Sequence, residues 1–483
     1  MPKSLKKNAF FNFVKCFMNL IFPIISFPYA SRILLPQGIG LVNFANSVIE
    51  YFLIIAELGI STYAAREAAK IRDDKEKLNK FAREIFTINI FSTVFSYTLL
   101  LFSLIFVDKF SEYRTLLIIC STKVLFTTAG IAWLFTAMED FGYITMRSIA
   151  FQVLSLIFLF AFVHDSGDVY QYAAMGVFSN VGSNIFNFFY SRKYINLFAK
   201  TKLELRKHFK PIFVFFGIGC ANKINQAIDA IMLGFMLGDI YVGFYSAASK
   251  LSKMVIELIT SVVSSFMPRS SYYVENNLQK EYQKVIEKVF GVAMFFSFPA
   301  AAGLFVLCKP LILIFSGEQY LPAASAMQVL SIGIIGWVTN SFLNNLIITP
   351  QRKEKYALAS RIAAASFNIA FNYIFIKKLG VFGAALATVI VEFILPSIVL
   401  IPSFKYLKSK QNLIAILQAV SGTAVMFAVI YFTGNLIEIN FLKIIFCVAA
   451  GSITYALAEL ILRNKTAFML WGIVNGIICK KRK

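Results

Sequence analysis

The sequence predicts an all-α integral membrane protein with about 14 transmembrane helices. The first reason is composition: the 483 residues are 58% hydrophobic and only 15% charged, with a mean hydropathy of +0.70. A soluble domain has about a quarter charged residues, and a soluble protein this apolar would expose patches large enough to drive association. The other two reasons are the lengths of the apolar segments and the placement of the basic residues.

Apolar segments of membrane-spanning length recur along the whole chain. A spanning helix needs about 20 mainly apolar residues. The first segment is longer than the apolar region of a typical signal peptide, so we expect it to remain as the first helix. The segments that meet the length criterion are residues 9–30, 39–63, 84–107, 115–138, 143–163, 169–190, 211–237, 241–267, 286–308, 323–349, 356–376, 380–402, 412–433 and 441–462.

Basic residues indicate the topology of these segments. Lys and Arg outnumber Asp and Glu by 47 to 25, which gives a formal net charge of +22. With the N-terminus in the cytoplasm, the predicted cytoplasmic loops and tails hold about five times as many Lys and Arg as the opposite loops. Membrane proteins carry this excess on their cytoplasmic side, so the charge does not indicate nucleic-acid binding. The bias predicts an even number of helices and two cytoplasmic termini.

The predicted segments form two sets of six, followed by a pair. A basic stretch lies between the sixth and seventh segments, where it would anchor to anionic lipid head groups or recognise a partner enzyme. The predicted parts are an N-terminal six-helix lobe at 1–190, a basic cytoplasmic linker at 191–210, a C-terminal six-helix lobe at 211–402, an extra helix pair at 403–462, and a basic cytoplasmic tail with a short interfacial helix at 463–483.

A stretch rich in proline and glycine joins the first two segments. Pro28 and Pro36 stop or kink a helix, and the following glycines allow a tight turn. A short copy of this stretch follows 203 residues later and places Gly243 at the position of Gly40. Prolines inside helices are either hinges or packing features. The predicted hinge and turn residues are Pro28, Gly38, Gly40, Gly243 and Pro299.

Catalytic and metal-binding motifs are absent from the sequence. It has no phosphate-binding GxxxxGK[ST] loop and no HExxH or GxSxG motif. No predicted loop is long enough to build the extramembrane site of a glycosyltransferase or polymerase. The six cysteines are scattered, and the two histidines, His164 and His208, lie in predicted loops without partners. We therefore expect no enzymatic activity, no metal and no cofactor.

Ionisable residues inside the apolar segments are the candidate functional residues. Such a residue is costly to insert and usually faces a cavity or a partner. The cations expected to line a central cavity and bind an anion are Lys15, Arg32, Lys123, Lys223, Lys250 and Lys253. The acids that are candidates for coupling transport to H⁺ or Na⁺ are Glu50, Asp229 and Glu257.

A cavity lined by several lysines would attract anions strongly in a low dielectric. Phosphate or pyrophosphate suits it, because ammonium groups bind these anions as point charges; a hydrophilic drug cation does not. Two simpler interpretations stay open. In the first, an intrahelical ion pair and one snorkelling lysine form among three residues at spacings of 3 and 4: Lys250, Lys253 and Glu257. In the second, Arg32 reaches the lipid head groups.

Several short motifs resemble those of bacterial polysaccharide flippases. These flippases are the O-antigen and capsule repeat-unit transporters of the multidrug/oligosaccharidyl-lipid/polysaccharide exporter superfamily. The residues that carry the resemblance are Pro28-Tyr29, Ser31-Arg32, Gly38-Ile39-Gly40, Asn43-Phe44-Ala45-Asn46, Leu58-Gly59, Arg66-Glu67 and Ile71-Arg72-Asp73-Asp74-Lys75. Leu379 to Ala385 resembles the glycine-alanine turn that precedes the twelfth helix in this superfamily.

The resemblance implies two six-helix lobes around a central cavity that opens alternately to either side. It implies a flippase that moves an undecaprenyl-pyrophosphate-linked oligosaccharide from the inner to the outer leaflet of the bacterial cytoplasmic membrane, for surface polysaccharide synthesis. The extra helix pair would form a groove for the lipid tail. Expected partners are this substrate, membrane lipids, H⁺ or Na⁺, and the polysaccharide polymerase and chain-length proteins. The alternatives are a drug/cation antiporter of the same superfamily and a membrane scaffold or polymerase of polysaccharide assembly.

Overall fold

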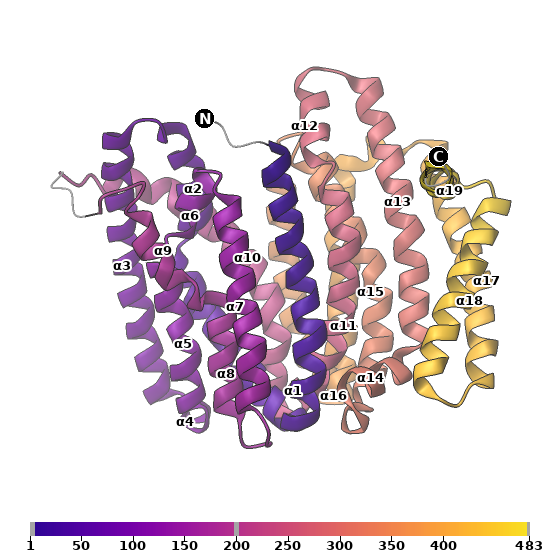
Figure 1. Ribbon diagram of the computed structural model, residues 1–483, viewed down its shortest axis with the longest axis horizontal. Coiled ribbons are helices and arrows are strands. Elements are labelled where there is room, and N and C mark those ends of the chain that lie inside the picture. Colours follow the sequence, from indigo (N-terminus) through magenta and orange to yellow (C-terminus); the bar gives the residue numbers. More distant parts are fainter. Residues whose placement is uncertain (1–4, 198–201, 481–483) are drawn as a thin grey trace. The chain divides into compact units, whose positions relative to one another are not determined.

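The computed structural model describes residues 5–197 and 202–480, and these residues form helices and connecting turns without any strand (Figure 1). The predicted all-α membrane fold is confirmed. The chain forms two compact units, residues 1–243 and 244–483. The predicted lobe boundaries at residues 190 and 211, and the separate helix pair at 403–462, stay predictions.

The first unit contains one long broken helix and a set of shorter ones. Its elements are α1 (Leu5–Glu57), α2 (Ile60–Ile71), α3 (Lys75–Phe106), α4 (Asp108–Glu112), α5 (Arg114–Ala129), α6 (Ala132–Ala137), α7 (Phe141–Phe162), α8 (Val169–Val177), the π-helical turn η1 (Phe178–Gly182), α9 (Asn184–Ser191) and α10 (Arg206–Met236). Helix α11 (Asp239–Ser264) begins in this unit and continues into the second.

The second unit contains the remaining helices. They are α12 (Met267–Glu275), α13 (Gln279–Val306), α14 (Cys308–Ser316), the 3₁₀ turn η2 (Glu318–Tyr320), α15 (Ala323–Leu343), the π-helical turn η3 (Asn344–Ile348), α16 (Glu354–Leu407), α17 (Lys410–Leu436), α18 (Asn440–Ile461) and α19 (Lys465–Lys480). Buried apolar side chains of α11, α13, α15 and α16 form the main core of this unit.

Within the described residues, nine helices are long and apolar enough to cross a membrane. Two of them, α1 and α16, each consist of two helices joined at one non-helical residue: Leu35 (φ 61°, ψ 173°) and Gly380 (φ 60°, ψ −134°). Leu35 lies between the predicted segments 9–30 and 39–63, and Gly380 is the first residue of the predicted segment 380–402. Glycine adopts this backbone freely, whereas Leu35 carries strain of about 1–3 kcal/mol. The total of about 14 spanning helices remains a prediction.

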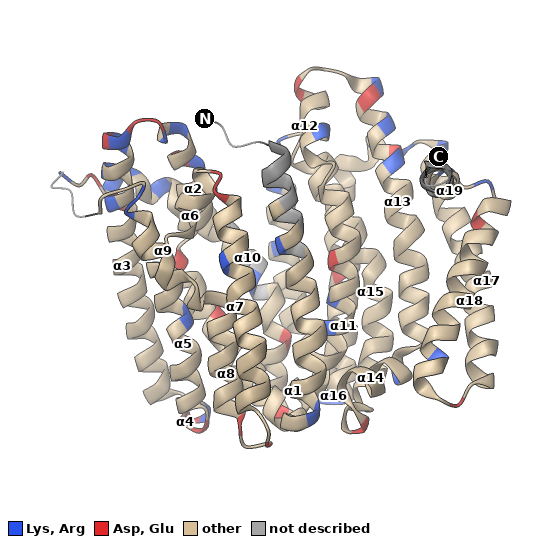
Figure 2. Ribbon diagram, viewed as in Figure 1, with Lys and Arg blue, Asp and Glu red and all other residues tan. Residues whose placement is uncertain are grey.

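Charged residues gather at one end of the helices in each unit (Figure 2). In the first unit, Lys and Arg lie around α2 and the starts of α3 and α10. In the second unit, they lie around α12, the start of α13 and the junction before α19. These ends correspond to the predicted cytoplasmic loops, and the apolar stretches between them fit a bilayer.

Candidate functional site

An intramembrane charge cluster joins three helices of the first unit. Lys123 on α5 donates a hydrogen bond to one oxygen of Glu50 on α1, and Lys223 on α10 donates to the other oxygen at 2.5 Å. The side chains of Glu50 and Lys123 are only 20% and 18% exposed, and that of Lys223 is 38% exposed. We call these three residues the Glu50 cluster. Its two lysines satisfy a carboxylate that would otherwise be costly at this depth.

The helix geometry explains why these residues meet. Helix α1 packs against both α5 and α10, so a side chain on its inner face reaches both neighbours. Glu57 follows Glu50 by about two helical turns and shares nearly the same face. It lies within electrostatic range of Lys123 and Lys223. The neighbourhood therefore contains two ammonium groups and two carboxylates.

The structure brings together three residues that the sequence analysis placed in separate roles. Lys123 and Lys223 are predicted substrate-binding cations, and Glu50 is a predicted coupling acid; their direct pairing was not foreseen. The cost of an isolated intramembrane carboxylate was the signal that could have suggested it. Asp229 is buried elsewhere on α10, within electrostatic range of Tyr51 on α1.

The other four predicted cations belong to two helices, α1 and α11. Lys15 is half-buried and Arg32 is exposed on α1, and both have interaction partners. On α11, Lys250 and Lys253 are half-buried and Glu257 is exposed. Glu257 lies within electrostatic range of both lysines. The substrate-binding and coupling roles of all these residues stay predictions.

The two proline- and glycine-rich turns make a reciprocal backbone contact in the first unit. A Cβ atom on Gly40 would collide with the carbonyl oxygen of Asp239, and one on Gly243 would collide with that of Pro36. Pro36 and Asp239 are separated by the same 203 residues as the two glycines. The repeated turns are therefore related by a local two-fold arrangement. Their roles as hinges, with those of Pro28, Gly38 and Pro299, stay predictions.

Side chains from the surrounding helices stabilise this backbone contact. Tyr113 donates a hydrogen bond of 2.5 Å to Asp239 at the start of α11. Lys109 donates to the backbone carbonyl of Gly234 and lies over the rings of Phe44 and Phe235, at 5.7 and 5.4 Å from their centroids. The end of α10 and the start of α11 are thereby fixed to the second half of α1 and to α4.

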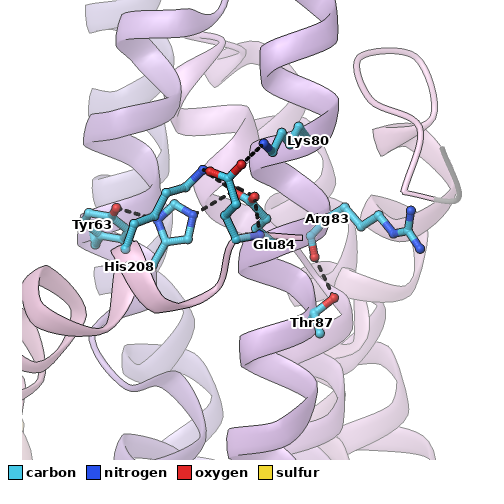
Figure 3. A network of polar contacts seen from close by, with 8 residues as sticks. Tyr63, Lys80, Arg83, Glu84, Thr87 and His208 are labelled. Carbon is cyan, nitrogen blue, oxygen red and sulfur yellow. Dashed lines mark hydrogen bonds and ion pairs between the residues drawn. The ribbon is translucent and has the colours of Figure 1, made fainter. Parts of the chain in front are cut away.

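A second polar cluster lies at the predicted cytoplasmic end of the first unit (Figure 3). His208 Nδ1 lies 2.8 Å from the hydroxyl of Tyr63, and its Nε2 lies 2.8 Å from Glu84 Oε2. Lys207 lies 3.0 Å from Glu84, and the backbone N–H of Glu204 donates to Glu84 at 2.9 Å. We call these five residues the Glu84 network. It joins α2, α3 and the segment that leads into α10.

The prediction that His208 lies in a loop without partners is wrong. Helix α10 begins at Arg206, five residues before the apolar segment that the sequence predicts, and its first turn lies among buried residues of α2 and α3. His208 is only 3% exposed and Glu84 is 1% exposed. The polar residues of this turn concealed the helix start. Outside the spans, Lys80 and Lys207 lower the pKa of Glu204 through hydrogen bonds to its carboxylate.

An apolar cavity of about 520 Å³ lies in the second unit among α13, α14, α17, α18 and α19. Pro299 lines it, together with aromatic and aliphatic side chains such as Phe295, Phe296, Leu304 and Met426. The chemistry of this lining suits a hydrocarbon chain.

A profile of the family described as polysaccharide biosynthesis protein matches residues 5–274, more than half of the 483-residue chain. The chain belongs to this family. A MatE profile also matches residues 215–374. The resemblance to polysaccharide flippases of the exporter superfamily, predicted from the N-terminal motifs, is confirmed.

Two relatives are similar to this chain over most of its length. A "Putative O-antigen transporter" of Shigella dysenteriae is 22% identical over 80% of this chain and 97% of its own length. The "Capsular polysaccharide biosynthesis protein CapF" of Staphylococcus aureus is 21% identical over 80% of this chain and 96% of its own.

Solved structures share the fold. The lipid II flippase MurJ in an inward closed conformation has a TM-score of 0.75 at 18% identity, over 94% of this chain and 98% of its own. An inward-facing multidrug resistance MATE family transporter has a TM-score of 0.60 at 14% identity, over 84% of this chain and 94% of its own. Both likenesses concern the fold.

Proposed function

We propose that this protein is a flippase, which moves an undecaprenyl-pyrophosphate-linked oligosaccharide from the inner to the outer leaflet for surface polysaccharide synthesis. The observation that carries the proposal is the Glu50 cluster: two lysines inside the membrane region share one carboxylate. The names of the relatives and the shared flippase fold support it. The protein would act as a carrier in the cytoplasmic membrane, with both termini in the cytoplasm.

The Glu50 cluster would bind the pyrophosphate by exchange of partners. Lys123 and Lys223 contact opposite oxygens of one carboxylate, so their ammonium groups are already spaced for an anion with several oxygens. Each phosphate of the substrate carries one negative charge, and charge-assisted hydrogen bonds to ammonium groups are strong. The diphosphate would therefore displace Glu50 and pair with both lysines.

Displacement leaves Glu50 without its cations, and an uncompensated carboxylate at this depth is costly. We propose that Glu50 then takes up a proton, which couples substrate binding to proton movement. When the site opens to the other side, loss of the proton lets Glu50 recover the lysines and expel the pyrophosphate. The proton therefore crosses in the same direction as the substrate, and a pH gradient that is alkaline on the release side should accelerate flipping. Meanwhile the sugars occupy hydrated space, and the polyprenyl tail lies in lipid.

The test is flipping of a fluorescent undecaprenyl-pyrophosphate oligosaccharide in proteoliposomes under an imposed pH gradient. Lys123→Gln and Lys223→Gln should each slow flipping at least about tenfold, because each removes one of two charge-assisted contacts. Lys377→Gln is the matched control, since Lys377 is exposed and outside the cluster. Retained folding is checked for every variant by thermal unfolding in detergent.

The outcomes distinguish a wrong substrate-binding site from a wrong function. Equal flipping by both cluster variants and the control would reject the Glu50 cluster but keep the flippase. No flipping by the unaltered protein with several lipid-linked sugars would reject the flippase. In that case efflux of a cationic dye tests the alternative antiporter, which the MATE-like fold and the acids Glu50, Glu57 and Asp229 favour.

A further inference from the structure

A second cavity of the second unit, separate from the apolar one, has a cationic lining. It encloses about 460 Å³ between the first half of α13, the start of α17 and the junction of α18 with α19. Four cations line it: Lys284 and Lys288 on α13, and Arg463 and Lys465 at the junction. Glu287 is the one carboxylate among the lining residues, so the cavity has an excess of positive charge.

The backbone fixes these cations around one space. Lys284 and Lys288 are four residues apart and share a face of α13. One turn further, a Cβ atom on Gly291 would lie 3.3 Å from Thr466 Oγ1, so α19 starts close against α13. The N–H of Thr466 donates to Asn464 Oδ1 at 2.8 Å. Both residues are buried, so the cations beside them project from an ordered junction.

The cations of this cavity have no carboxylate partner within the described part of the chain. Lys465 donates to the amide oxygen of Gln411 at 2.8 Å. Glu287 accepts from Gln283 at 3.1 Å, and no ion pair joins it to Lys284 or Lys288 in the segments that the structure covers. Four cations held around a concave surface without matching anions suit a multiply charged oxygen anion such as a phosphate.

One wall of the cavity is apolar. Ile414 and Ala415 of α17 face it, with Met469 of α19. The cavity lies where the predicted cytoplasmic loop enters α13 and where a predicted interfacial helix begins, which is the depth of lipid head groups. A ligand that joins a phosphate to an acyl chain would use both parts of the lining.

We propose that this cavity binds the phosphate head group of an anionic phospholipid, which bridges α13 to the junction of α18 with α19. Lys284 and Lys288 contact the phosphate from one side, and Arg463 and Lys465 from the other. The acyl chains lie along Ile414 and Met469. A soluble phosphate offers the same head-group chemistry without the chains, so the test must distinguish the two sources.

The experiment is native mass spectrometry of the full-length protein in detergent, titrated with phosphatidylglycerol or phosphatidylcholine. We expect one tightly bound phosphatidylglycerol and no matching phosphatidylcholine. Two double variants should each weaken this binding about tenfold: Lys284→Gln with Lys288→Gln, and Arg463→Gln with Lys465→Gln. The matched control is Lys280→Gln with Lys410→Gln, because both lysines are exposed at the starts of α13 and α17 and neither lines the cavity.

Glu287→Gln should change lipid binding in the opposite direction. Removing the carboxylate should tighten phosphatidylglycerol binding about two- to threefold, which a misfolded protein would not do. Equal loss in the control pair would overturn the proposal, since general surface attraction would explain it. Equal binding of phosphatidylcholine would overturn the head-group assignment. Displacement of the lipid by millimolar inorganic phosphate or pyrophosphate would overturn the lipid in favour of a soluble anion.

Discussion

Glu84 is a buried carboxylate on α3 whose three direct partners all come from residues 204–208, at the start of α10. It accepts from His208, from Lys207 and from the backbone N–H of Glu204, while Tyr63 holds the other nitrogen of the imidazole. A buried anion with these contacts is stable only while they all persist. The Glu84 network therefore ties the start of α10 to α2 and α3, at the same helix whose Lys223 belongs to the Glu50 cluster.

We expect Glu84→Ala to lower the free energy of unfolding by about 3 kcal/mol, because it leaves the buried imidazole of His208 and the backbone N–H of Glu204 without their acceptor. Scanning fluorimetry of the purified protein measures this as a lower Tm. Glu76→Ala is the control on the same helix, and its exposed side chain should change stability by less than about 0.5 kcal/mol. Equal effects of the two substitutions would show that the Glu84 network adds no stability.

Helix breaks are the features of the elements that the sequence predicted best. Prolines and glycines around residues 28–40, and the glycine-alanine turn at 379–385, predicted the breaks at Leu35 and Gly380. Proline interrupts a helix, and glycine adopts backbone conformations that other residues avoid. The start of α10 was missed, because a charged helical turn looks like a loop when only apolar periodicity is read. The pairing of Glu50 with two lysines was also missed, because contacts between distant helices leave no local pattern.

The repeated turn gives a prediction at the level of elements. Gly40→Ala and Gly243→Ala should each lower the free energy of unfolding by about 1–3 kcal/mol, because each Cβ would meet a backbone carbonyl that cannot move aside cheaply. Gly217→Ala is the control, since no atom lies within 4 Å of the added Cβ and alanine favours helix. Thermal unfolding in detergent should leave this control at or slightly above the starting Tm. Unchanged Tm values for both turn variants would contradict the close backbone approach.

For the whole molecule, the distribution of charge predicts a topology that labelling can check. In a background with its cysteines replaced by serine, we expect Ser166→Cys, between α7 and α8, and Glu318→Cys, in η2, to react with an impermeant maleimide in intact cells. Asn276→Cys, after α12, should react only after permeabilisation. All three positions are exposed, so burial does not limit the reaction. Labelling of Asn276→Cys in intact cells would invert the predicted orientation of the second unit.

The proposed transport cycle depends on one carboxylate that competes with the substrate for two lysines. Glu50→Gln removes the competing charge while keeping the size of the side chain, so it should tighten binding of the lipid-linked oligosaccharide about three- to tenfold. The same change removes the group that takes up the proton, so the pH gradient should no longer accelerate flipping. Glu438→Gln is the control, because Glu438 is exposed between α17 and α18.

Binding to the purified protein and flipping in proteoliposomes must therefore change in opposite directions in the Glu50→Gln variant. Tighter binding together with slower, gradient-independent flipping would support exchange of Glu50 for the pyrophosphate at Lys123 and Lys223. Weaker binding would mean that Glu50 orients the lysines for the substrate instead of competing with it. A flipping rate that still depends on the pH gradient would show that Glu50 is not the coupling group. Asp229, which is buried on the same helix as Lys223, would then be the next acid to neutralise.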